Sequence, residues 1–112
     1  HKVLLQLTSD DPEIHKSAIS HIHNIIKAFD QIDIELVTHG KGIGLLLKGS
    51  ALESKLQKLP EKGVKLLVCK NALEANNLSE SDVLAFCQVI PSAVAHLIVR
   101  QSEGWSYLRE TL

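Results

Sequence analysis

Apolar and polar residues change their spacing along the chain, and the order of these changes predicts alternating strands and helices. Over residues 13–30, apolar residues recur every three to four positions, which indicates an amphipathic helix. The preceding stretch TSDDPE has the hydroxyls, carboxylates and proline that commonly start a helix, with Pro12 suited to the first turn. Short apolar segments bounded by turn residues are typical of strands: residues 2–7, 33–40, 64–69, 94–100 and 105–109.

The segments between these strands favour shorter helices and turns. Residues 78–90 read as a helical apolar run, in which Ser79 and Asp82 have nearly the spacing of a capping box. Alternating strands and helices predict an α/β layer structure with a mainly parallel sheet, whose functional sites lie at the carboxyl ends of the strands. Further short helices or turns are expected at residues 41–50, 51–63 and 70–77.

Composition and charge narrow the class of protein. A length of 112 residues predicts one domain over residues 1–112, with 45% hydrophobic and 22% charged residues as in soluble globular proteins. The net charge of −1 gives no reason to expect nucleic acid as a direct partner. No apolar stretch approaches the roughly 20 residues of a membrane helix, and the opening residues read as a strand rather than a signal peptide. Two cysteines are too few for a disulfide framework, so a reduced, cytoplasmic location is expected.

Cys69 is the first candidate for chemistry, because it lies where a predicted strand meets a predicted helix. A helix N-terminus and the neighbouring Lys70 would both favour a thiolate. Cysteine is also a common small core residue, so a buried, inert thiol is an equally good interpretation. Cys87 lies in an apolar run without a charged neighbour and is expected to be a core residue. A disulfide between the two cysteines is left open by the sequence.

The histidines and glycines give weaker indications of a functional site than Cys69 does. The three histidines of the first helix include no pair spaced by four residues, so no metal site is expected. His39 differs because it ends a strand, where it could serve as a proton donor, an oriented polar neighbour or a plain turn residue. The glycine-rich turn GKGIG matches neither a dinucleotide-binding nor a phosphate-loop pattern, and no cofactor is expected.

The stretch RQSEGWSYLR, residues 100–109, holds the only tryptophan and the only tyrosine of the chain. One interpretation is a strand that closes the sheet edge. The other is an oligomer contact formed by Arg100, Trp105 and Tyr107, because aromatic residues and arginine are enriched at interfaces. The two interpretations are compatible.

Three stretches of the chain resemble the DsrE/DsrF-like family, in its small single-domain branch. They are HGKGIGLL at residues 39–46, CKNALEANNL at residues 69–78 and IPSAVAHLIVRQSEGWSYLR at residues 90–109. The resemblance covers nearly the whole chain. It implies the DsrEFH-like (YchN-like) fold, a three-layer α/β/α sandwich around a mainly parallel five-stranded sheet. It also implies homo-oligomers, commonly trimers or hexamers.

The resemblance further implies a role in sulfur relay. In well-studied relatives a cysteine at this strand-to-helix position takes a persulfide sulfur and passes it on, in sulfur oxidation or tRNA thiolation. That cysteine corresponds to Cys69, whose thiol is then expected to be exposed at the helix N-terminus. Lys70 and the backbone N–H groups of Asn71 and Ala72 would stabilise the anionic sulfur. His39 would lie beside this thiol, at the same carboxyl ends of the strands.

The implied partners are sulfur donor and acceptor proteins, and stoichiometric transfer would make the protein a carrier more than a catalyst with turnover. A function of another class stays open beside this one. It is a non-catalytic oligomeric binding module that holds a small anion or a partner protein at the carboxyl ends of the strands. Helix N-termini at those ends suit an anion without any thiol chemistry.

Overall fold

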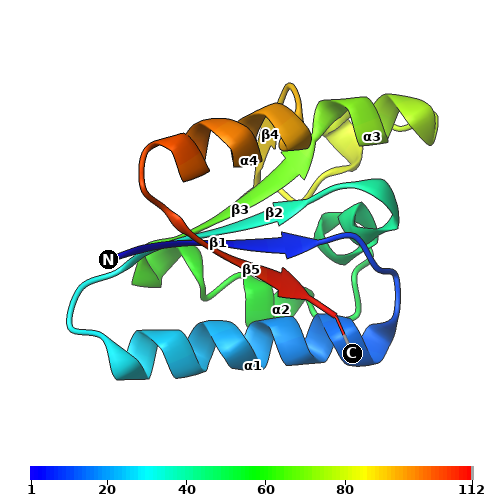
Figure 1. The fold of residues 1–112 in the computed structure, drawn as a ribbon. Helices are drawn as coiled ribbons and strands as arrows, with labels where there is room; N and C mark the ends of the chain where they lie inside the picture. The colour runs from blue at the N-terminus through cyan, green and yellow to red at the C-terminus, as the bar shows by residue number, and fades with distance from the viewer. Residues whose placement is uncertain (112) are drawn as a thin grey trace.

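Five parallel strands form the centre of the molecule, which is described here over residues 1–111 by a computed structural model (Figure 1). Their spatial order is β4-β3-β2-β1-β5, and every neighbouring pair is parallel. The carboxyl ends of all five strands therefore meet at one edge of the sheet. The strands are β1 (Lys2–Leu7), β2 (Asp33–Thr38), β3 (Val64–Cys69), β4 (Gln88–Ile90) and β5 (Ser106–Glu110).

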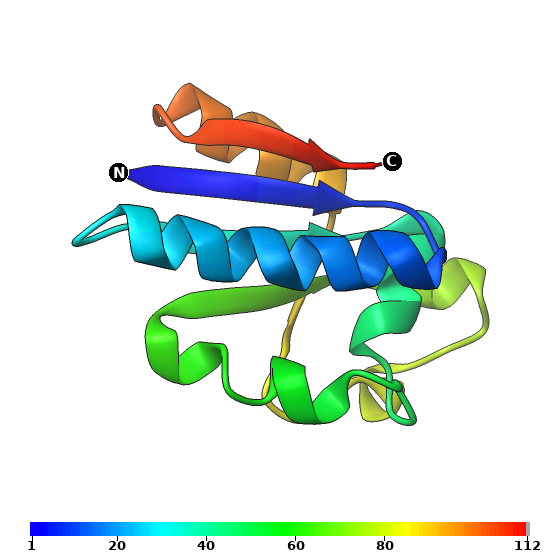
Figure 2. The ribbon, with the colours of Figure 1, turned by 90° about the horizontal axis from the view of Figure 1, so that it is seen from below.

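Helices cover both faces of the sheet and give the molecule three layers. Figures 1 and 2 show α1 and α2 on one face, with α3 and α4 on the other. The expected α/β/α sandwich around a five-stranded parallel sheet is thus confirmed. The helices are α1 (Pro12–Ala28), α2 (Glu53–Leu56), α3 (Lys70–Ala75) and α4 (Ala93–Ser102), with short 3-10 helices η1 (Gly40–Leu46), η2 (Pro60–Lys62) and η3 (Glu80–Asp82).

Helix α1 begins and packs as the sequence pattern predicts. The Asp11 carboxylate accepts a hydrogen bond from the Glu13 N–H at 2.8 Å, and Pro12 occupies the first turn, where its missing N–H costs nothing. The three central strands carry apolar side chains on both faces, because each face is covered by a helical layer. The face of α1 that is buried consists of Ile14, His15, Ala18, Ile19 and Ile22.

The prediction of a strand at residues 94–100 is wrong, because this segment belongs to helix α4. Its β-branched residues favour a strand locally, but tertiary contacts favour the helix. The Ser92 side chain caps the helix by accepting the Ala95 N–H at 3.2 Å. His96 and Arg100, four residues apart, then reach the same carboxylate of Glu35 on β2, which they could not do from a strand.

The prediction of a helix over residues 78–90 is also wrong. The capping box at Ser79 is real, since its N–H donates to the Asp82 carboxylate at 2.8 Å, but it opens only the single turn of η3. The chain then returns to the sheet, where Cys69 pairs with Ile90 and β4 completes the edge. Cys87 therefore lies in the turn before β4 rather than in a helix, and it is partly buried.

Candidate functional site

Cys69 is the last residue of β3 and the N-cap of α3, as the sequence predicts. The expectation of an exposed thiol is wrong, because the residue is only 5% exposed. Its Sγ makes no capping hydrogen bond within α3. It accepts instead the N–H of Ala93, the first residue of α4, at 3.4 Å. The first turn of α4 shields the sulfur, so the N-termini of two helices converge on this thiol.

The residues that follow Cys69 divide between the surface and the interior. Lys70 and Asn71 are exposed in the first turn of α3, while Ala72 is buried beneath it. The first N–H groups of a helix have no partner within it, so those of Asn71 and Ala72 contribute positive partial charge near the sulfur. Both cysteines of the chain carry free thiols.

His39 lies beside Cys69 at the carboxyl edge. The register of β2 and β3 pairs Thr38 with Val68, so the next residue of each strand, His39 and Cys69, are neighbours. The backbone of His39 is still extended, and its N–H donates to the Leu7 carbonyl at 3.2 Å. Side chains at paired positions of parallel strands lie on the same face, so the imidazole is on the α4 side with the thiol.

A polar network joins His39 to the far edge of the sheet. The Gln6 Nε2 donates to the His39 Nε2 at 2.7 Å, and the Tyr107 hydroxyl donates to the Gln6 Oε1. Because an amide nitrogen can only donate, the neutral imidazole must hold its proton on Nδ1. Burial, and secondarily the positive charge of Arg109, lower the pKa of His39, which favours this neutral form.

Sequence reasoning missed three groups at this edge: the Ala93 N–H, Gln6 and Arg109. Gln6 gave one recognisable indication, since it is the polar residue near the carboxyl end of an otherwise apolar strand. Arg109 and the Ala93 N–H gave none, because only the sheet order and the course of α4 bring them to Cys69 and His39.

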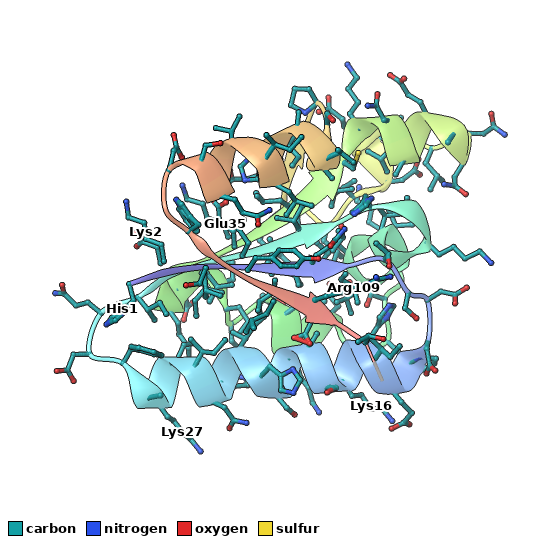
Figure 3. All side chains as sticks on the ribbon, in the orientation of Figure 1. His1, Lys2, Lys16, Lys27, Glu35 and Arg109 are labelled. Atoms are coloured by element: carbon teal, nitrogen blue, oxygen red, sulfur yellow. The ribbon has the colours of Figure 1, made fainter. Side chains whose placement is uncertain are left out.

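The residues predicted at an oligomer contact have partners within the chain. Arg100 donates to both carboxylate oxygens of Glu35 at 3.1 Å and lies over the Trp105 ring, 4.8 Å from its centroid. Figure 3 shows Glu35 between the sheet and α4. These contacts attach α4 to β2 and so hold its N-terminus over Cys69. Tyr107 is 38% exposed and bonds Gln6.

The Glu35 carboxylate makes the attachment of α4 to β2 sensitive to acid. Burial raises its pKa, but hydrogen bonds from Arg100 and His96 outweigh this and lower the pKa below the ordinary 4.5. A carboxyl whose pKa is lowered in the folded state stabilises the fold above its unfolded pKa. That contribution is lost as the pH falls below 4.5 and through the folded-state pKa.

We expect Glu35→Gln to lower the free energy of unfolding at neutral pH by about 2 kcal/mol, because charge-assisted hydrogen bonds in a buried site become neutral ones. The variant should also lose part of the decline in stability that the parent shows below pH 4.5. Urea unfolding across this pH range measures both effects. Glu74→Gln, at an exposed position, is the matched control and should leave both unchanged. Equal acid slopes in Glu35→Gln and the parent would contradict the assignment.

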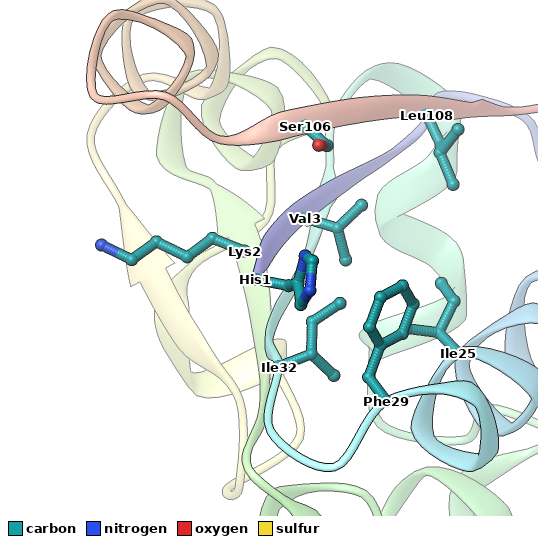
Figure 4. A pocket seen from close by; sticks show the side chains of 8 residues that line it. All are labelled: His1, Lys2, Val3, Ile25, Phe29, Ile32, Ser106 and Leu108. Atoms are coloured by element: carbon teal, nitrogen blue, oxygen red, sulfur yellow. The ribbon is translucent and has the colours of Figure 1, made fainter.

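An apolar pocket of about 190 Å³ lies at the opposite, amino edge of the sheet, between α1, β1 and β5 (Figure 4). The His1 and Phe29 rings contact each other there, with centroids 4.6 Å apart. This pocket is remote from Cys69. Within residues 1–111, no group of three or more histidine, cysteine or acidic side chains could hold a metal ion. None of the helices described is long and apolar enough to cross a membrane.

The family model of the DsrE/DsrF-like family matches residues 1–109. The chain belongs to the DsrE/DsrF-like family. This family is associated with sulfur relay. No curated protein gives a significant match to the sequence.

Solved structures of similar proteins support the fold of this DsrE/DsrF-like chain. A protein of unknown function from Methanobacterium thermoautotrophicum, MTH1491, is 29% identical with a TM-score of 0.95, over 97% of this chain and 98% of that one. The conserved protein BT1422 from Bacteroides thetaiotaomicron, also of unknown function, is 13% identical with a TM-score of 0.78, over 96% and 93%. The ychN protein from E. coli is 13% identical with a TM-score of 0.75, over 96% and 97%.

Proposed function

We propose that the protein is a sulfur carrier that takes a persulfide sulfur on Cys69 and passes it to an acceptor protein. The Cys69 thiolate attacks the outer sulfur of a donor persulfide, R–S–SH, and the S–S bond of the donor breaks. The donor leaves as a thiolate that takes up a proton, and Cys69–S–SH forms without net oxidation. Attack by an acceptor thiolate on the same outer sulfur returns Cys69 to its starting state.

The observation that carries this proposal is the position of the Cys69 sulfur between two helix N-termini. The Ala93 N–H already donates to Sγ at 3.4 Å, and Cys69 is itself the N-cap of α3, whose first N–H groups have no partner within the helix. A persulfide is more acidic than a thiol and more often anionic, so fixed donors favour the loaded state. The His39 Nδ1–H, with Lys70, adds a donor and a cation at the same edge.

Sulfur transfer also requires access to a thiol that is only 5% exposed. The first turn of α4, which follows the exposed Pro91 in the chain, covers the sulfur. Terminal turns of helices open more readily than their centres, because they contribute fewer hydrogen bonds and contacts. We therefore expect loading to begin with displacement of this turn.

Mass spectrometry of the reduced protein after incubation with a persulfide or polysulfide donor tests the proposal. We expect a gain of about 32 Da on the peptide that contains Cys69, reversed by a reductant. Sulfur on the Cys87 peptide alone, or no gain in the folded protein, would contradict it. The donor and acceptor proteins would then be sought by mixing loaded protein with candidate thiol proteins.

A binding module is the second candidate function, and the burial of Cys69 favours it. In this alternative, the edge formed by His39, Arg109 and the two helix N-termini holds a small anion or a partner protein, and Cys69 only packs. Titration with an aromatic disulfide reagent separates the two. Reaction of Cys69 in the native protein within minutes supports the carrier, whereas reaction only after denaturation supports the module.

We also propose that the protein is a homo-oligomer whose contact centres on α4. Val94, Ile98 and Val99 are 58%, 61% and 52% exposed, which leaves an apolar helix face in water. Equilibrium sedimentation should show a species of several times 12.3 kDa. Ile98→Asp should shift it toward the monomer, and Asn24→Asp on the exposed side of α1 should not. A strictly monomeric parent protein would contradict this proposal.

A further inference from the structure

A groove lined by lysines lies on the face of the molecule opposite α3 and α4. It runs between α1 and the segment that contains α2 and η2, which lie on the same face of the sheet (Figure 2). Its volume is about 460 Å³, within the range of small-ligand sites. Four lysines line it: Lys16, Lys55, Lys58 and Lys62. The groove is separate from the carboxyl edge that holds Cys69.

Positive charge in this groove is mostly uncompensated. Of the four lysines, only Lys16 has a carboxylate of residues 1–111 within ion-pair distance, that of Glu13 at 3.5 Å, and both side chains are largely exposed. Lys55, Lys58 and Lys62 have no such partner among these residues. The chain as a whole has a net charge of −1, so this concentration is local. Like charges around one concavity repel one another, and an anion in the groove would relieve that repulsion.

The polar side chains that line the groove come from two elements, α1 and the segment that contains α2 and η2. Ser20 and His23 follow Lys16 by four and seven residues, which places them along one side of α1. The lysines on the facing segment recur after three and four residues. The facing segment thus contributes three lysines along the groove, and α1 contributes Lys16 with the polar Ser20 and His23.

The remaining lining residues restrict the class of anion. Ile19 and Leu52 form an apolar part of the lining, and neither a phenylalanine, tyrosine or tryptophan nor an arginine is among the lining residues. A nucleobase would find only the His23 imidazole as a ring to stack on, and a carboxylate would find no bidentate guanidinium. Lysines bind phosphates as point charges, and Ser20 and His23 can add hydrogen bonds. The matching chemistry is a short chain of phosphates.

We propose that this groove binds a compact anion with several phosphates, either free inorganic polyphosphate or the phosphate chain of a nucleotide. The site is independent of the sulfur chemistry proposed for Cys69. Tripolyphosphate should bind more tightly than inorganic phosphate, because its several charged groups can pair with more of the four lysines at once. Binding should weaken steeply as sodium chloride is added, since the lysines are exposed and screened.

Isothermal titration calorimetry of the full chain with tripolyphosphate, ATP, inorganic phosphate, sulfate and a single-stranded oligonucleotide tests the proposal. Lys55→Gln/Lys58→Gln should weaken tripolyphosphate binding by about tenfold, the sum expected for two exposed charge pairs. Lys41→Gln/Lys48→Gln removes the same charge from exposed positions outside the groove and should leave the affinity unchanged. Far-ultraviolet circular dichroism checks that both variants are folded.

Comparison of the affinities for tripolyphosphate and ATP distinguishes inorganic polyphosphate from a nucleotide as the ligand. Equal affinity for tripolyphosphate and ATP would indicate that the phosphates alone are recognised, and a clear preference for ATP would assign the site to a nucleotide. The proposal is overturned if tripolyphosphate does not bind, if sulfate binds equally well, or if Lys55→Gln/Lys58→Gln binds like the parent protein. Tighter binding of a single-stranded oligonucleotide would overturn it in favour of a nucleic-acid surface.

Discussion

Cys69→Ser is expected to abolish persulfide loading completely while the protein stays folded. A serine hydroxyl cannot form a persulfide, so no sulfur can be held at this position. The serine oxygen can still accept the Ala93 N–H that the sulfur accepts in the parent protein. A cost of about 1 kcal/mol in the free energy of unfolding is expected, because a more polar group occupies a nearly closed site. Intact mass after incubation with polysulfide, together with a thermal unfolding curve, measures both quantities.

Cys87→Ser is the matched control for this prediction. Burial raises the pKa of the Cys87 thiol to about 12, so almost none of it is thiolate at neutral pH and it should react poorly with a persulfide. Loading of this variant should equal that of the parent protein. Full loading of Cys69→Ser, lost only when Cys87 is also replaced, would move the sulfur site to the turn before β4.

Gly42→Ala is expected to destabilise the protein by about 3 kcal/mol or to prevent folding. A Cβ atom at this position would lie 2.2 Å from the Leu7 carbonyl oxygen and 3.0 Å from the Thr8 Cα. Both are backbone atoms of the segment that leaves β1, so neither can move aside as a side-chain tip could. Overpacking of this kind in a fixed site costs about 1–3 kcal/mol and occasionally more. Chemical denaturation measures the loss.

Gly44→Ala provides the comparison within the same 3-10 helix. No atom outside its immediate surroundings lies within 4 Å of the Cβ that would be added, and its φ is not positive. Reduced freedom of the unfolded chain should leave this variant as stable as the parent protein or slightly more stable. A similar loss in both variants would show that η1 rejects any alanine, rather than that β1 and η1 are in close contact at Gly42.

The fold could be predicted from the sequence where local pattern and tertiary environment agree. The prediction was correct for β1, α1, β2 and β3, because the apolar residues that set their periodicity are also the residues that are buried. The prediction of a strand at residues 94–100 was wrong because Val94, Ile98 and Val99 favour strands locally but remain largely exposed on a helix. The decisive interaction is the ion pair of Arg100 with Glu35, 65 residues away, which no local pattern shows.

The position of Cys69 in the fold could be predicted from the sequence, but its surroundings could be predicted only in part. A strand-to-helix boundary places Cys69 at the carboxyl edge of a parallel sheet whatever the details of packing. The degree of exposure of the thiol depends on α4, which the sequence interpretation treated as a strand. The same error concealed the Ala93 N–H as a donor to the sulfur. Gln6, His39 and Tyr107 form a network only because β5 joins the sheet next to β1.

That last pairing has a consequence for how the protein is made. β1 precedes the other four strands of the sheet in the chain, yet its partner on one side is β5, so that Tyr107 and Gln6 are separated by 101 residues. Until residues 106–110 have emerged, one edge of β1 has unpaired N–H and C=O groups. The nascent chain thus carries an open strand edge while the residues between β1 and β5 are synthesised, and its neighbours on a polysome carry the same edge.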